Sequence, residues 1–322
     1  MIQNLPTPED YQIVAWECLI QAYKSIVQVD SLELSPSVDR DELWVYNRTV
    51  LHTAVVLVHQ GVESALKSGV AVKSPLLLLE QKPGEWKTLP ESSDVEFADL
   101  YTISGNDLLR TYFATAQDTA AIHPDFVQHF EDVRLLRNKI VHGLGATDLT
   151  PEVVLRLILK TFTTLYGKGS FWTALQDKFY NHPAQEEGEL TFVFSEYEQY
   201  QHLAYLELFL GKGELNKHFD QDFKSRRYHC PDCTGSGGVL VPKDGEPELY
   251  PNFKYSFLHP NTPESTHIKC AVCQGEFEVE RTDCNQAECP GNVIFIDDED
   301  ADAHEDNDEP LPKICLTCNE YQ

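Results

Sequence analysis

The stretch VYNRTVLHTAVVLVHQGVESALKSG, residues 45–69, decides the fold of the N-terminal half of the chain. Its apolar residues recur every three or four positions, which is the spacing of one face of an amphipathic α-helix. That face carries Leu51, Val55, Val58, Val62 and Leu66. Residues 8–29 repeat the pattern with Ile13, Trp16, Leu19, Ile20, Tyr23, Ile26 and Val27. The two segments therefore predict two long helices of a helical bundle.

More helices are expected up to about residue 182. The pattern predicts them at residues 74–80, 106–116, 124–142, 151–166 and 169–180, and it places Pro151 in the first turn of its helix. The helix over 45–69 also has a polar side that carries His52, His59, Glu63 and Lys67. We expect this side to face solvent or a neighbouring helix rather than a ligand. Residues 1–182 are therefore predicted to form an all-helical domain.

The pattern changes in the second half of the chain. Residues 183–227 read as a connecting segment that is partly helical, with a strand at TFVFSE, residues 191–196, and a helix at 197–211. From residue 228 onward, short β-like runs alternate with cysteine pairs: GVLVP (238–242), KYSFL (254–258), GEFEVE (275–280) and NVIFI (292–296). The predicted fold class is α+β, mainly α, with a helical bundle followed by a small β-rich, zinc-ribbon-like domain at 228–322.

Eight of the nine cysteines fall in four close pairs, which is metal-ligand spacing. The pairs are Cys230/Cys233, Cys270/Cys273, Cys284/Cys289 and Cys315/Cys318. Two pairs complete one tetrahedral zinc site, so four pairs predict two structural zinc ions. The pairs either combine sequentially, first with second and third with fourth, or cross-braced, first with third and second with fourth. Cys18 stands alone in a helical pattern and is expected to be a small buried residue.

The chain is acidic, with a formal net charge of −27. Residues 1–180 carry 15 Lys and Arg against 23 Asp and Glu, a net charge of −8, and the remainder carries −19. This excludes a globally basic nucleic-acid binder, so any RNA contact requires a local basic patch. Residues 1–12 lack the basic start and apolar core of a signal peptide, and the apolar runs are too short to span a bilayer. We therefore expect a cytoplasmic protein without a membrane segment.

The helix that ends near Gly143 carries a polar motif, LRNKIVHGLG, residues 136–145. Asn138 and His142 are four residues apart and share one helix face. His142 lies in the last turn, where the helix dipole favours positive charge. A titratable imidazole beside a permanent guanidinium suits phosphoryl chemistry, with His142 transferring protons and Arg137 stabilising charge on a phosphate. The same pair also serves as an ordinary set of capping charges in many helices.

The string from Arg137 to His142 matches RNxxxH, the signature of the HEPN superfamily, named for its nucleotide-binding members in higher eukaryotes and prokaryotes. Residues 8–180 resemble this superfamily in the motif and in the order of helices. The resemblance implies a metal-independent endoribonuclease whose two motif helices face each other in a homodimer. It implies that Arg137 and His142 are the catalytic pair and that Asn138 positions them. Arg134 and Lys139 are then the expected RNA-binding residues.

The resemblance also implies a biological setting, since members are frequent in toxin–antitoxin systems, anti-phage defence and RNA processing. Expected partners are RNA, a second copy of the chain and an antitoxin or regulatory protein. The alternative is a non-catalytic adaptor in which the helical domain dimerises and the zinc module binds a protein. A nucleic-acid-binding zinc ribbon is disfavoured by the acidic second half. The acidic run at 297–310 reads as a solvated loop, or as a polyanion mimic that covers an RNA groove.

Overall fold

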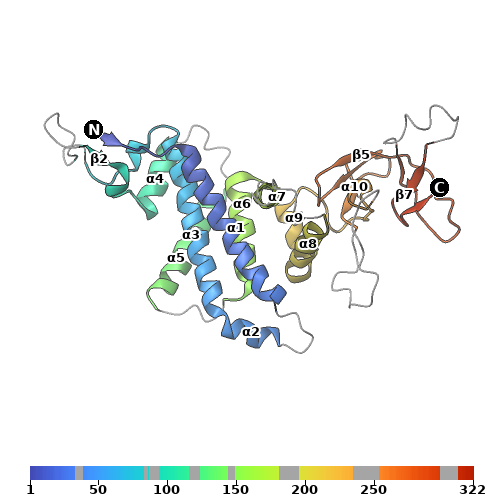
Figure 1. Cartoon of the computed structure of the whole chain (residues 1–322), viewed down its shortest axis with the longest axis horizontal. Helices are drawn as coiled ribbons and strands as arrows, with labels where there is room; N and C mark the ends of the chain where they lie inside the picture. The colour runs from blue at the N-terminus through green and yellow to red at the C-terminus, as the bar shows by residue number, and fades with distance from the viewer. Residues whose placement is uncertain are drawn as a thin grey trace, which may run out of the picture. The chain divides into compact units, whose positions relative to one another are not determined.

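The computed structural model describes residues 1–32, 39–82, 86, 94–115, 124–143, 149–180, 196–234, 254–297 and 311–322. The chain divides into two compact units, Met1–Leu175 and Gln176–Gln322 (Figure 1). The boundary expected after residue 182 lies among residues that the structure does not describe. The chain is mainly helical with a few small sheets, which confirms the mainly α, α+β class at this level.

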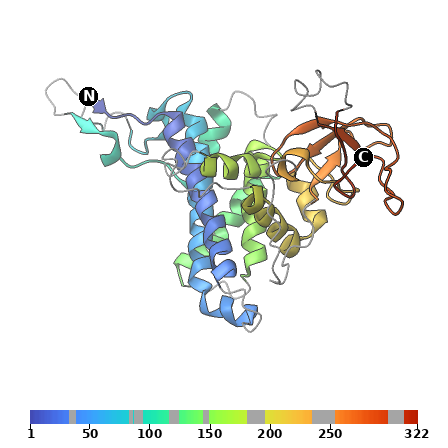
Figure 2. The ribbon, with the colours of Figure 1, turned by 45° about the vertical axis from the view of Figure 1, so that its right-hand side comes forward.

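Two long antiparallel helices, α1 (Pro8–Leu32) and α3 (Arg48–Ala71), form the centre of the first unit and lie side by side in Figures 1 and 2. Gly61 permits their close approach, because a Cβ there would lie 2.8 Å from Leu19 Cγ and 3.1 Å from the Ala15 carbonyl oxygen. The predicted helix over 45–69 needs one correction. It is interrupted at Asn47, which separates the short helix α2 (Arg40–Tyr46) from α3. Asp39 caps the start of α2, and its side chain accepts hydrogen bonds from the backbone N–H groups of Asp41 and Glu42.

The other helices of the first unit follow the predicted order, and two short strands and a 3₁₀ turn were not expected. These elements are β1 (Ile2–Gln3), η1 (Pro75–Leu78), β2 (Val95–Glu96), η3 (Phe97–Asp99), α4 (Gly105–Thr115), α5 (Phe126–Val141) and α6 (Pro151–Tyr166). Helix α7 (Ser170–Tyr180) begins in the first unit and ends in the second. The segment expected to be helical at 74–80 is a 3₁₀ turn, and the two-residue strands β1 and β2 pair in parallel. Pro151 is the first residue of α6, as predicted, and the Thr150 side chain caps it. Helix α5 packs against α3 and α6.

A polar network joins α1, α2 and the start of α6. The Arg40 guanidinium donates to both oxygens of Asp30, at 3.0 and 2.9 Å, and to Glu152 Oε1 at 2.7 Å. Trp44 Nε1 donates to the same Asp30 carboxylate at 2.8 Å. Asp30 is 2% exposed, so the carboxylate depends on these donors in place of water.

Asp30→Ala is expected to lower the free energy of unfolding by about 3 kcal/mol, because it removes the acceptor of the Trp44 N–H and leaves Arg40 with Glu152 alone. Chemical denaturation measures the loss. Asp107→Ala is the matched control, since the Asp107–Arg110 pair is exposed and its shortest N–O distance is 3.8 Å. The control should unfold like the wild type. Equal losses in both variants would contradict a structural role for the network.

The same network predicts a pH dependence through Glu152. Burial opposes ionisation, but hydrogen bonds from Arg40, the helix backbone and Thr150 lower the pKa of Glu152 below its ordinary value. Because the pKa of Glu152 is lower in the folded than in the unfolded state, ionised Glu152 stabilises the fold at pH values above its unfolded pKa. This stabilisation is lost as the pH falls through the folded pKa. We expect the stability difference between wild type and Glu152→Gln to shrink below about pH 4. A difference that stays constant on acidification would contradict this assignment.

The second unit begins with helices and continues into two small sheets. Its helices are α8 (Glu196–Leu210), α9 (Lys212–His218) and α10 (Pro231–Thr234). Its strands are β3 (Ser256–Leu258), β4 (His267–Cys270), β5 (Glu276–Glu278), β6 (Ile294–Ile296), β7 (Lys313–Cys315) and β8 (Glu320–Tyr321). Each group of three forms an antiparallel sheet, in the order β3-β4-β5 and β6-β7-β8.

One apolar core joins the two sheets. It contains Tyr228, Leu258, Ile268, Val279, Val293, Ile314 and Leu316, and the Phe277 and Phe295 rings pack on it edge to face at 6.1 Å. Backbone hydrogen bonds between Glu280 and Ile294 connect the sheets. The sheets therefore form a single body with a shared core rather than two independent modules.

Three predicted β-like runs coincide with β3, β5 and β6. The run at 238–242, residues 191–195 of the expected strand TFVFSE and residues 298–310 of the acidic loop lie outside the described residues. Glu196, the last residue of TFVFSE, opens helix α8. Strands β4, β7 and β8 and helix α9 were not expected. Among the described residues, no helix is both long enough and apolar enough to cross a membrane.

Candidate metal centres and the Arg137–His142 helix end

Eight cysteines gather into two groups of four in the second unit. Cys230, Cys233, Cys270 and Cys273 form the first group, and Cys284, Cys289, Cys315 and Cys318 form the second. Within each group, the sulfur atoms all lie within 4.8 Å of one another. The sequential grouping is therefore the one that the fold adopts, and the cross-braced alternative is wrong. We call these groups the first and second cysteine centres.

The sulfur positions fit a tetrahedral zinc ion. A Zn–S bond of about 2.3 Å places the sulfurs of a tetrahedron about 3.8 Å apart. The observed separations are 3.7 Å for Cys230–Cys273, and 3.8 Å for both Cys284–Cys318 and Cys289–Cys315. Backbone N–H groups point at the sulfurs, from Val272 to Cys270 at 3.3 Å and from Gly275 to Cys273 at 3.3 Å. Such donors favour thiolates, the form that binds metal.

The two centres are built on the same plan. Each second cysteine pair starts on the last residue of a strand, Cys270 on β4 and Cys315 on β7, and continues through a turn into the next strand. In both turns the residue after the second cysteine has a positive φ, 65° at Gln274 and 62° at Asn319. The second unit therefore contains a structural repeat that the sequence shows only as its cysteine pairs.

Two basic side chains donate hydrogen bonds to the backbone of the second cysteine centre. Arg226 Nη2 donates to the Pro290 carbonyl oxygen at 3.0 Å, beside the ligand Cys289. Lys254 Nζ donates to the Thr317 carbonyl oxygen at 2.6 Å, between Cys315 and Cys318. The two bonds thus reach both cysteine pairs of the second centre. The segment that carries the first centre thus supports the second one.

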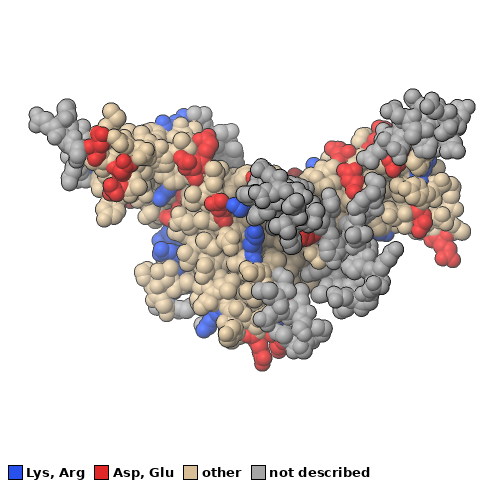
Figure 3. Space-filling model, viewed as in Figure 1, with Lys and Arg blue, Asp and Glu red and all other residues tan. Residues whose placement is uncertain are grey.

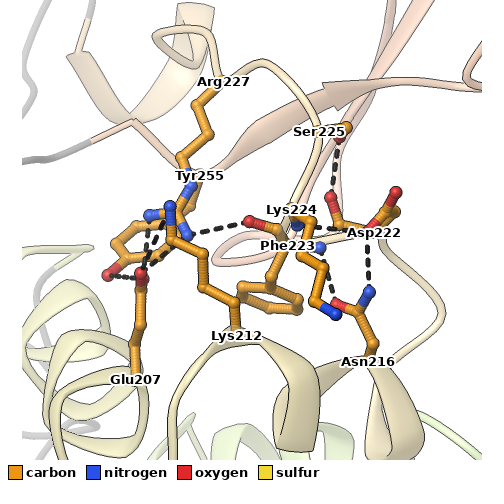
Figure 4. Close-up of polar contacts among 9 residues, drawn as sticks. All are labelled: Glu207, Lys212, Asn216, Asp222, Phe223, Lys224, Ser225, Arg227 and Tyr255. Carbon is orange, nitrogen blue, oxygen red and sulfur yellow. Dashed lines mark hydrogen bonds and ion pairs between the residues drawn. The ribbon is translucent and has the colours of Figure 1, made fainter.

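The segment before Cys230 carries three basic residues, Lys224, Arg226 and Arg227, but Arg227 does not contribute to a basic surface patch. Arg227 makes a bidentate ion pair with Glu207 of α8, with both N–O distances at 2.8 Å (Figure 4). Its guanidinium carbon lies 4.8 Å from the centre of the Tyr255 ring. The Arg227 side chain is only 10% exposed. It therefore belongs to the interior between α8 and the first sheet.

Arg227→Ala is expected to destabilise the second unit by about 3 kcal/mol, because it leaves the half-buried Glu207 carboxylate without its main partner. Arg227→Lys should recover only part of this loss, since an ammonium cannot replace the planar bidentate contact. Thermal unfolding provides the measurement. Lys224→Ala is the control and should leave the midpoint unchanged. If Arg227→Ala weakens RNA binding without lowering the midpoint, Arg227 is a surface contact and our assignment is wrong.

The motif residues lie at the C-terminal end of α5. His142 is the C-cap, and its backbone N–H bonds to the carbonyl oxygens of Asn138 and Ile140. Gly143 follows with φ 72°, as expected for a glycine that ends a helix. The His142 side chain is exposed, whereas Arg137 and Asn138 are half-buried. Arg137 Nη1 donates to Asn138 Oδ1 at 3.0 Å.

Arg137 and His142 lie on different sides of α5. Arg137 follows the buried Val133 by four residues, so its side chain starts on the side that packs into the unit. His142 follows Asn138 by four residues and the exposed Leu135 by seven. Among the described residues, no hydrogen bond or ion pair joins Arg137 to His142. One copy of the chain thus presents the two groups as neighbours on a helix end, without direct contact.

Helix α3, which packs against α5, carries a polar pair on its polar side. His59 Nδ1 is 3.8 Å from Glu63 Oε2, and both side chains are nearly buried, at 12% and 13% exposure. Burial lowers the pKa of His59; Glu63 opposes the shift, and the charges of Arg137 and Arg134 add to it. The polar side of residues 45–69 is therefore an inter-helix face at this point, one of the two settings expected. The helical spacing of His59 and Glu63 was visible in the sequence, but their proximity to α5 was not.

The two expected RNA-binding residues, Arg134 and Lys139, differ in ion pairing and exposure. Arg134 is paired with Glu131 on its own helix at 2.6 Å, whereas Lys139 is exposed. On the face shown in Figure 3, the described Lys and Arg side chains are scattered and form no wide basic surface. Any phosphate contact at α5 thus depends on Arg137 and Lys139 more than on a wide basic surface.

No family model, no curated protein and no solved structure matches this chain.

Proposed function

We propose that the helical unit is a metal-independent HEPN-type endoribonuclease and that its active site is built on the C-terminal end of α5. The observation that carries the proposal is the placement of the RNxxxH motif. It ends a bundle helix with His142 exposed on the C-cap and the Arg137 guanidinium bonded to Asn138. A motif buried within the bundle would not be accessible to a phosphate.

The proposed site needs a second copy of the chain. The exposed side of α5 carries Val127, Leu135 and Val141, each between 45% and 51% exposed. Apolar side chains in such a position favour association. Two copies that meet along this side would bring their two α5 ends together, each with an exposed His142 and a half-buried Arg137. This arrangement would double the local positive charge against the acidic background.

The residues have separate roles in the proposed reaction. The ribose 2′-oxygen loses its proton and bonds to the adjacent phosphorus, the bond from phosphorus to the 5′-oxygen breaks, and the leaving oxygen gains a proton. His142 transfers protons, because imidazole serves as acid or base near neutral pH. Arg137 stabilises the growing phosphate charge, and Asn138 orients Arg137. Lys139 and Arg134 contact the RNA backbone.

The cysteine-rich part of the second unit is proposed to bind the RNA substrate, a trigger or a regulatory protein such as an antitoxin. Closed four-cysteine centres are structural, since they leave no open position on the metal. Zinc in these centres would stabilise the sheets and supply no chemistry to RNA cleavage. A toxin or anti-phage defence role in the cytoplasm agrees with the proposed activity.

The test is cleavage of single-stranded RNA by the purified full chain, without added divalent cations. We expect products that end in a 2′,3′-cyclic phosphate, because the 2′-oxygen is the nucleophile. An oligonucleotide with a single 2′-deoxy sugar at the cleaved position should resist. Absence of cleavage at every salt concentration, together with capture of a stable protein partner, would instead favour the non-catalytic adaptor.

A further inference from the structure

Helix α3, which packs against α5, carries a polar pair that the cleavage scheme above does not use. His59 and Glu63 lie one turn apart on α3, next to α5. Two observations on neighbouring groups make this pair unusual for a helix interface. Glu63 accepts a hydrogen bond from helix α4, and the Nε donor of Arg137 has no acceptor among the described residues.

Glu63 is fixed between α3 and α4. The Gly105 N–H, at the first residue of α4, donates to Glu63 Oε1 at 3.2 Å. Its other oxygen, Oε2, is the one that lies near His59 Nδ1. Lys67, one turn further along α3, donates to Thr102 Oγ1 at 3.0 Å and is close enough for Glu63 to influence its pKa. The carboxylate is thus anchored on one side and faces the imidazole on the other.

Arg137 has a donor without an acceptor on the side that packs into the unit. Its Nε is buried and has no hydrogen-bond partner among the described residues, although Nη1 donates to Asn138. A buried donor without an acceptor is unfavourable, because it has lost its hydrogen bonds to water. A neutral imidazole has one ring nitrogen that accepts a hydrogen bond. Burial lowers the pKa of His59, and the charges of Arg137 and Arg134 lower it further.

We infer that the His59–Glu63 pair positions the Arg137 guanidinium, with Glu63 orienting the imidazole and His59 offering its free ring nitrogen to the arginine. The inference rests on the proposed function of Arg137 in RNA cleavage. The lowered pKa of His59 supports it, because the neutral ring is the form that accepts a hydrogen bond from a guanidinium. His59 is a positioning residue here and does not touch the RNA.

The decisive experiment compares His59→Ala, His59→Gln and Glu63→Gln with wild type in the RNA cleavage assay. His52→Ala is the matched control, because His52 is a half-buried histidine on the same helix, seven residues before His59. We expect kcat to fall about 10- to 100-fold in His59→Ala with little change in KM, since a misplaced catalytic group costs rate. His59→Gln, which keeps an acceptor, should recover part of the rate. His52→Ala should cleave like the wild type.

A second readout is the pKa of His59, measured by NMR on histidine-labelled protein. Removing the positive charge in Arg137→Ala should raise this pKa, whereas Lys139→Ala should leave it unchanged. If wild type cleaves, Arg137→Ala does not, and both His59 variants cleave like wild type, the positioning role is overturned while the proposed function stands. If wild type and Arg137→Ala show the same RNA cleavage, the proposed function fails, and this inference fails with it.

Discussion

Arg137→Ala and His142→Ala are each expected to lower the single-turnover rate of RNA cleavage by about 10²–10⁴-fold. The lower end is typical of losing one charge-stabilising group and the upper end of losing a general acid or base. Neither change should unfold the protein, because His142 is exposed and Arg137 already has an unpaired Nε. Cleavage of a labelled RNA, with circular dichroism as a folding check, measures both effects.

Lys139→Ala is the matched control for these two variants. Lys139 is a cation on the same helix turn, but it is exposed and its proposed contact is with the RNA backbone. We expect weaker RNA binding and a smaller salt dependence, with the rate at saturating RNA nearly unchanged. If Lys139→Ala lowered the cleavage rate as much as Arg137→Ala, the rate would depend on the total positive charge of the helix end and not on the RNxxxH motif.

Metal removal is expected to have the second large effect. The purified chain should contain two zinc ions, and a strong chelator should abolish the folded sheets of the second unit. Structural zinc contributes about 10–16 kcal/mol of apparent binding free energy in small domains, which exceeds what a core of this size supplies alone. Near-UV circular dichroism and metal analysis report the loss, and added zinc should restore the signal.

A double variant tests the grouping of the cysteines. Cys230→Ser with Cys270→Ser removes two ligands from the first cysteine centre and none from the second. We expect such a chain to retain one zinc ion. A cross-braced arrangement would place the same two cysteines in different sites and lose both ions. Cys18→Ser is the control, since Cys18 belongs to neither centre and burial raises the pKa of its thiol.

The sequence predicts the helical part of the fold well, because burial of one face imposes a spacing on every long helix. Leu51, Val55 and Val58 of α3 follow this rule and are all buried. The break at Asn47 was not predicted, because the apolar spacing of residues 51–66 does not determine at which residue the helix begins. The two- and three-residue strands of the second unit carry too few residues for a pattern. Their pairing depends on the cysteine turns and on the shared core.

The candidate site is predictable only where one segment contains all of its residues. Arg137, Asn138 and His142 lie in six consecutive positions, so a motif finds them. His59 comes from another helix, and its relation to Arg137 depends on how α3 and α5 pack. Arg227 shows the converse error. Its neighbours Lys224 and Arg226 suggest a basic surface, but Arg227 forms a nearly buried ion pair with Glu207, twenty residues earlier in the chain.

A double-mutant cycle tests most directly whether Arg137 and His142 form one catalytic unit. Single-turnover RNA cleavage is measured for wild type, Arg137→Ala, His142→Ala and the double variant. Groups that act together lose most of the rate when either is removed, so the double variant should be about as slow as the slower single variant. Equal rates for wild type and the double variant would contradict the account, because RNA cleavage would then not depend on this helix end.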